Sequence, residues 1–155
     1  APSLSRVRSK LMFVLKQFCS VPFTPGKQEW GYETDPKDTI GPRVLPLVIA
    51  EIEEYLKLCG DNDDKKGEMA RRLAEDRRGF RAMYEDCTTN AILLLVNLST
   101  SVLICDKLHK KKFLELLHQL TSTKLGVNET LAPRIETLRL RIDSVARAKD
   151  TGEKK

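Results

Sequence analysis

AILLLVNLSTSVLIC, residues 91–105, is the most apolar stretch of the chain, and Asp86 and Asp106 flank it. A helix that crosses a membrane needs about 20 predominantly apolar residues, and this stretch is shorter than that. Polar residues also interrupt it in its second half, at Asn97, Ser99, Thr100 and Ser101. A helix that is apolar on all sides but does not span a membrane is typical of the centre of a helical protein. The stretch therefore predicts a buried central helix and no transmembrane segment.

The composition favours an all-α fold. The chain has 155 residues, of which 41% are hydrophobic and 32% charged, as in a soluble globular protein of about one domain. Aromatic residues make up only 6%, leucine is abundant, and β-branched runs are few. We predict a single-domain helical bundle of five or six amphipathic helices over residues 1–148, followed by a polar tail at 149–155 that frays.

Hydrophobic spacing locates the helices around the central one. Apolar residues recur every three or four positions over 3–19, from Pro42 or Pro46 to Cys59, from Met69 to Cys105, over 107–123 and over 129–148. The first helix carries its stripe at Leu4, Val7, Leu11, Val14 or Leu15, and Phe18. The last carries a heptad-like seam at Leu131, Ile135, Leu138, Ile142 and Val145. The long segment from Met69 to Cys105 is predicted to kink or break at 86–90 or at Gly79, because Thr and Asn favour caps and Gly weakens a helix.

Residues 20–43 are predicted to form a long irregular loop. They contain four of the seven prolines, three of the eight glycines and the only tryptophan. Loops of this length in compact domains are uncommon and are often functional. Its three large aromatic residues either pin the loop to the body of the protein or present a contact surface to a partner: Phe23, Trp30 and Tyr32.

Charge is distributed unevenly along the chain. The net charge is +5, with +4 in residues 1–20, −5 in residues 21–106 and +6 in residues 107–155. Such a pattern suits complementarity between helices of the protein, or an acidic partner at one end. Three groups of cations are candidate contacts for acid or phosphate, or else form solvated faces: Arg71, Arg77, Arg78 and Arg81; Lys110, Lys111 and Lys112; Arg139 and Arg141.

The four cysteines, Cys19, Cys59, Cys87 and Cys105, have no metal-binding spacing. Buried free thiols in the cytoplasm or nucleus are the favoured interpretation. The alternative is a secreted, cytokine-like helical protein with two disulfides, in which the sequons at Asn97 and Asn128 would be permitted. The acidic turn after Cys59 fails as a calcium loop, because both possible registers put cations where oxygen ligands are needed.

No nucleotide-binding, hydrolase, kinase or metalloprotease motif is present in the sequence. We therefore expect no catalytic activity, no cofactor and no metal. His109 and His118 are nine residues apart, so one straight helix would point them to opposite sides. The expected function is an intracellular protein–protein interaction domain, acting as adaptor, scaffold or regulator, whose partner has an acidic or helical contact surface. The alternative is a helical domain that binds nucleic acid through its basic faces.

Overall fold

A computed structural model describes residues 2–20, 36–59 and 80–153, and within these ranges the chain is helical with no strand. The predicted all-α class is confirmed for this part of the chain. No helix in these ranges has both the length and the apolar character needed to cross a bilayer. The helices are α1 (Pro2–Ser20), α2 (Pro36–Thr39), α3 (Gly41–Cys59), α5 (Phe80–Leu98), α6 (Val102–Leu108), α7 (Lys111–Leu120) and α8 (Ala132–Glu153).

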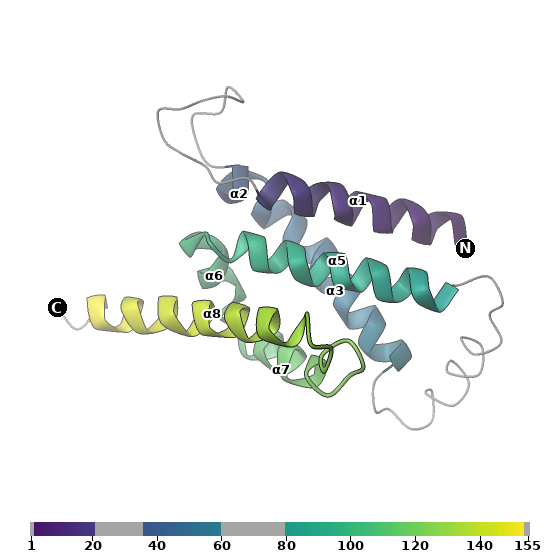
Figure 1. The fold of residues 1–155 in the computed structure, drawn as a ribbon. Coiled ribbons are helices and arrows are strands. Elements are labelled where there is room, and N and C mark those ends of the chain that lie inside the picture. The colour runs from purple at the N-terminus through teal and green to yellow at the C-terminus, as the bar shows by residue number, and fades with distance from the viewer. Residues whose placement is uncertain (1, 21–35, 60–79, 154–155) are drawn as a thin grey trace.

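Helix α5 lies between α1 and α8, and these three helices run in the same direction (Figure 1). Helix α3 crosses behind α5 at a steep angle and contacts it. The short α6 packs against α8, and α7 contacts both α3 and α8. Helix α5 is thus covered by neighbours on several sides, as its all-round apolar character requires.

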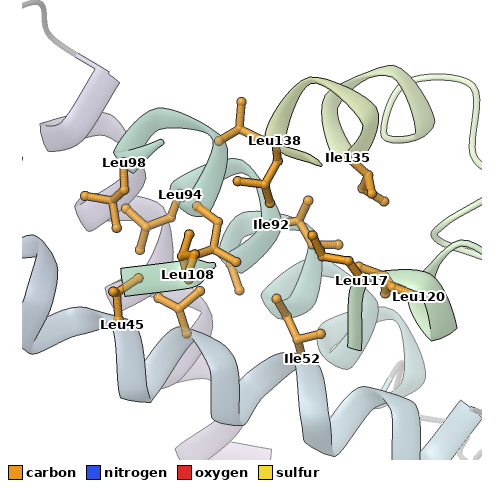
Figure 2. Packing of buried hydrophobic residues seen from close by; sticks show 14 of the residues in the cluster. Leu45, Ile52, Ile92, Leu94, Leu98, Leu108, Leu117, Leu120, Ile135 and Leu138 are labelled. Carbon is orange, nitrogen blue, oxygen red and sulfur yellow. The ribbon is translucent and has the colours of Figure 1, made fainter. Parts of the chain in front are cut away.

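The buried side chains form one hydrophobic core that draws on every one of these helices except α2. Figure 2 shows leucine and isoleucine side chains of α3, α5, α6, α7 and α8 converging on one centre. Leu94 and Leu98 of α5 have no exposed surface, and neither do Ile52 of α3 and Leu138 of α8. Each side chain of this kind stabilises the fold by about 1.5–3 kcal/mol when it is fully buried.

The predicted central helix over 91–105 is instead two helices, because α5 ends at Leu98 and α6 begins at Val102. The polar residues between them form hydrogen bonds with backbone groups at the helix ends. Ser99 Oγ donates to the Val96 carbonyl at 2.6 Å, and Thr100 Oγ1 donates to the Asn97 carbonyl at 3.0 Å. Ser101 is the N-cap of α6. Short hydroxyl side chains that bond to nearby backbone groups compete with helix continuation, which explains the break.

The break predicted at 86–90 is absent, since α5 continues through these residues. Two of their polar side chains, those of Asp86 and Asn90, form hydrogen bonds with a neighbouring helix. Asp86 accepts a hydrogen bond from Ser9 Oγ at 2.8 Å, and the Asn90 carboxamide oxygen accepts one from Lys16 Nζ at 3.0 Å. Both partners lie on α1, so tertiary contacts absorb groups that would otherwise cap a helix end.

Three further expectations differ from the structure. Residues 36–39 and 41–43, predicted as part of the irregular loop, form α2 and the start of α3. Of the two starts predicted for this helix, Pro42 is confirmed to within one residue because α3 begins at Gly41, whereas Pro46 lies one turn inside the helix. Residues 149–153, predicted as a fraying tail, continue α8 as a helix. Residues 21–35, and with them Phe23, Trp30 and Tyr32, lie outside the described ranges.

The side of α1 that faces the core is not the side predicted from its apolar stripe. Met12 and Cys19 are buried against the core, with Leu15 half-buried beside them. Of the predicted stripe residues whose side chains the structure describes, Val7, Leu11 and Val14 are exposed, and only Leu15, the alternative to Val14, packs against the core. The interface between α1 and α5 is instead partly polar, and Asn97 Nδ2 donates to the Lys16 carbonyl across it at 3.0 Å.

Candidate interaction groove

A groove with an apolar lining lies between α3 and the α6–α7 segment, and it encloses about 510 Å³. Helix α3 presents one wall with residues three or four positions apart, because that spacing places them on the same helix face. The opposite wall comes from α6 and α7, which meet at an angle since the chain turns at His109 and Lys110. The lining residues are Pro42, Leu45, Pro46, Ile49, Ala50, Glu53, Lys107, Leu108, Lys110, Lys112, Phe113 and Leu116.

The groove continues along α3 into a second hollow of about 280 Å³. The two hollows share Glu53, Lys112 and Leu116. The second one reaches Lys57 on α3 and Gln119 on α7. Together they follow α3 from Pro42 to Lys57, a length of about 22 Å at the rise of an α-helix. An elongated groove of this length suits a segment of polypeptide better than a compact small molecule.

Two exposed lysines, Lys107 and Lys110, line one end of the groove, and a third, Lys112, lies where its two hollows meet. Lys110 is also the N-cap of α7, where its side chain makes no capping hydrogen bond, and the first turn of α7 contains no acid. The N-terminus of a helix carries partial positive charge, so cations there are unfavourable by about 0.3–1 kcal/mol each. An anionic group placed at this end of the groove would meet both the lysines and the positive end of the α7 dipole.

Lys111, unlike Lys110 and Lys112, does not line the groove. It borders another hollow, of about 580 Å³, together with His109, His118 and Glu115. The two histidines border the same hollow because the helix predicted over 107–123 is interrupted at 109–110. No set of three potential metal ligands comes together anywhere in the described part of the chain.

Arg139 and Arg141 are both engaged within the protein. Arg139 is exposed and pairs with Glu136 and Asp143 on its own helix, and this hydrogen bond from Arg139 lowers the pKa of Glu136. Arg141 is half-buried, and its Nη1 donates to the Val96 carbonyl at 2.8 Å and to Ser99 Oγ at 2.9 Å. Arg141 therefore joins α8 to the C-terminal end of α5, where a cation interacts favourably with the helix dipole.

The structure does not describe the side chains of the remaining cationic candidates. Arg71, Arg77 and Arg78 lie outside the described ranges. Arg81 falls in the first turn of α5, but its side chain is not among those described. Of the predicted residues, the structure therefore brings together Lys110 and Lys112 only.

Sequence reasoning missed Lys107 and both apolar walls of the groove. A sequence signal for the α3 wall does exist, because Pro42, Pro46 and Ile49 follow one another at steps of four and three. Nothing in the sequence indicates that this face lies opposite Phe113 and Leu116, which belong to a helix more than 60 residues further along the chain.

The structure describes the side chains of three of the four cysteines, and Cys19, Cys87 and Cys105 are free and buried. Cys87 Sγ donates to a carboxylate oxygen of the buried Glu51 at 3.4 Å, and Cys105 Sγ donates to the Ser99 carbonyl at 3.0 Å. Burial raises the pKa of the Cys105 thiol, and the nearby Arg141 partly offsets this. The Cys105 thiol is therefore held in the protonated form, which is the less reactive one.

Comparison of the chain with protein-family models, with curated proteins and with solved structures returned no match.

Proposed function

We propose that the protein is an interaction module, without catalytic activity of its own, that binds an acidic segment of a partner protein in the groove between α3 and α7. The observation that carries the proposal is an apolar groove whose α6–α7 side bears three lysines, against one acid, Glu53, on α3. An amphipathic helix lays its apolar side chains into a groove of this kind, while charges at the rim select the partner.

The dimensions of the groove support a helical ligand. Its length of about 22 Å corresponds to about four helical turns. Ile49 and Leu116 are half-buried at the groove surface, and Leu45 and Phe113 are buried beneath. A ligand helix with apolar residues three or four positions apart would cover these side chains, and acidic residues near one end would face Lys110 and Lys112.

Three further features support an adaptor or regulatory role inside the cell. The groove is lined by apolar side chains, three lysines and Glu53, which can hold a ligand but include no nucleophile with an adjacent base. The buried free thiols Cys19, Cys87 and Cys105 are typical of a reducing compartment, and we propose a cytoplasmic or nuclear location. Asn97 Nδ2, the atom that would carry a glycan in a secreted protein, is hydrogen-bonded to the Lys16 carbonyl.

Nucleic acid is the competing ligand class, and the internal contacts of Arg139 and Arg141 argue against it. A nucleic-acid site needs several cations free to reach successive phosphates. Arg139 is paired with two acids, and Arg141 donates to groups of α5. Lys107, Lys110 and Lys112 share the groove with apolar side chains and Glu53, and this mixed lining suits a peptide better than a polyphosphate backbone.

The test begins with a displayed library of random peptides about 16 residues long, selected on the full chain. We expect the enriched peptides to combine Leu, Ile or Phe at helical spacing with Asp or Glu toward one end. An enriched peptide is then labelled, and its Kd is measured by fluorescence anisotropy at low and high salt. Binding should weaken as salt rises, because part of the attraction is electrostatic.

Two variants test the groove, and one serves as the matched control. Lys110→Glu combined with Lys112→Glu should weaken binding at least tenfold. Ala50→Gln introduces a neutral polar side chain into the groove and should weaken it severalfold. Lys111→Glu makes the same charge change between the two altered lysines but outside the groove, and should leave the Kd within about twofold.

Two results would contradict the proposal. One is equal loss of binding in the Lys111→Glu control and in the double lysine variant. The other is steep, salt-dependent binding of mixed-sequence RNA or duplex DNA that the double variant abolishes and Ala50→Gln does not change. The second result would assign the lysines to nucleic acid.

A further inference from the structure

Helix α1 has two distinct faces, and only one of them packs against the described part of the protein. Met12 and Cys19 are buried at 2% and 4% exposure, on the side that contacts α5. Val7, Leu11 and Val14 are exposed by 62%, 45% and 60% respectively. Such a row of aliphatic side chains along one helix is costly in water unless something covers it.

The exposed residues have the spacing of a helix-pairing seam. The steps from Val7 to Leu11 and from Leu11 to Val14 are four and three, as between successive d, a and d positions of a heptad. In this register the exposed Lys10 occupies a g position, and e and g residues flank the seam and decide which helix pairs with it. The sequence of α1 contains four cations and no acid. We call Val7, Leu11 and Val14 the α1 seam.

We propose that the α1 seam pairs with an acidic amphipathic helix of a partner protein. Apolar a and d residues of that helix would pack on the seam, and Glu or Asp at its e and g positions would face the cations of α1. Pairing between two copies of α1 is disfavoured, because it would oppose cation to cation along the seam. An anionic membrane is also disfavoured, since interfacial helices use a broad apolar face and α1 directs Met12 and Cys19 into the core.

The α1 seam is separate from the groove between α3 and α7. Helices α1 and α7 lie on opposite sides of α5 in Figure 1, and α1 contributes no residue to the groove. The inference therefore does not depend on the proposed function. If both surfaces bind, the protein holds two partners at the same time, as a scaffold does.

The probe is a synthetic peptide of about three heptads with Leu at a and d, Glu at e and g, and Ala at the other positions. Repulsion between glutamates keeps this acidic peptide from pairing with itself. A second peptide carries Lys in place of Glu and is otherwise identical. Each is labelled and titrated with the full chain, and the Kd is read by fluorescence anisotropy. We expect the acidic peptide to bind, the basic peptide not to bind, and rising salt to weaken binding.

A pair of variants on the same helix isolates the seam. Leu11→Glu inserts a charge at the centre of the seam and should weaken binding of the acidic peptide at least tenfold. Phe13→Glu makes the same kind of change at a residue that is equally exposed, at 46%, but lies off the seam, and should leave the Kd within about twofold. Lys10→Glu should weaken binding of the acidic peptide severalfold, because it reverses a charge that flanks the seam. Circular dichroism melting checks that each variant stays folded.

Several outcomes would overturn the inference. Binding that survives Leu11→Glu but falls in the Lys110→Glu, Lys112→Glu variant would put the peptide in the groove, and the proposed function would stand without the seam. If sedimentation shows a dimer that Leu11→Glu dissociates, the seam pairs with a second copy of this chain instead. The occupant of the seam would be a membrane if the protein sediments with vesicles of phosphatidylserine and phosphatidylcholine, Leu11→Glu abolishes this, and the acidic peptide does not bind. Failure of the acidic peptide to bind at low salt would remove the helix partner altogether.

Discussion

Replacing Arg141 by Met should destabilise the protein far more than replacing Arg139 by Met. The two arginines stand two residues apart on α8, so the substitutions have the same chemistry and the same helix. Arg141 is half-buried and donates from Nη1 to the Val96 carbonyl and to Ser99 Oγ, whereas Arg139 is exposed and pairs only with acids of its own helix.

The magnitude follows from the groups that Arg141→Met leaves behind. Methionine keeps most of the aliphatic stem, so packing is largely preserved and the loss is polar. A hydrogen bond from a charged donor contributes about 1.5–3 kcal/mol, and losing the cation at the C-terminal end of α5 adds about 0.3–1 kcal/mol. Ser99 Oγ still donates to the Val96 carbonyl at 2.6 Å, which reduces the cost. We expect a loss of about 2 kcal/mol in the free energy of unfolding.

Urea denaturation followed by circular dichroism measures the free energy directly, and thermal melting gives an independent value. For a chain of this size 1 kcal/mol shifts Tm by about 2–4 °C, so Arg141→Met should lower Tm by about 4–8 °C. Arg139→Met should leave Tm nearly unchanged, because exposed ion pairs contribute little. In Arg139→Met, NMR titration should also find the pKa of Glu136 returned toward its ordinary value, since Arg139 is what lowers it.

Equal Tm changes in the two variants would contradict this prediction, because the larger loss expected for Arg141→Met comes from the hydrogen bonds between α8 and α5. The same conclusion would follow if Ser99→Ala and Arg141→Met were additive in a double-mutant cycle, since partners in one hydrogen-bond network should couple.

Two more predictions concern the core around α6. A Cβ atom added at Gly41 would lie 2.8 Å from Cδ1 of Ile104, so Gly41→Ala should destabilise the protein by about 1–3 kcal/mol. The loss should be smaller in an Ile104→Val background, which lacks this methyl group. If urea denaturation shows that the effects of Gly41→Ala and Ile104→Val simply add, the clash is not the cause. Burial raises the pKa of the Cys105 thiol, so the folded state keeps this proton to higher pH than the unfolded chain. The contribution of this thiol to folding stability is present below the ordinary thiol pKa near 9, and it is lost as the pH rises through the folded pKa. Wild type should therefore lose stability above pH 9 more steeply than Cys105→Ala, and identical slopes would show that Cys105 does not contribute.

The helical class and most helix positions follow from local spacing alone. The apolar steps of α3, α7 and α8 predict these helices, because a helix that packs on a core repeats its contacts every three or four residues. The heptad-like seam of α8 is buried as predicted, with Ile135, Leu138 and Ile142 at the core. Helix α1 is also predicted, although the structure exposes Val7, Leu11 and Val14, which the stripe would have placed at the core.

The sequence determined by itself that residues 91–105 are too short and too polar to span a membrane and belong to a helical core. Only the tertiary structure decided how that stretch is divided. The hydroxyl groups of Ser99, Thr100 and Ser101 end one helix and start the next, while Asp86 and Asn90 stay inside a helix because α1 engages them. A polar side chain in a helical pattern either caps the backbone or contacts a neighbouring helix. The choice between the two depends on which groups come within hydrogen-bonding distance after the chain has folded, and local spacing does not contain that information.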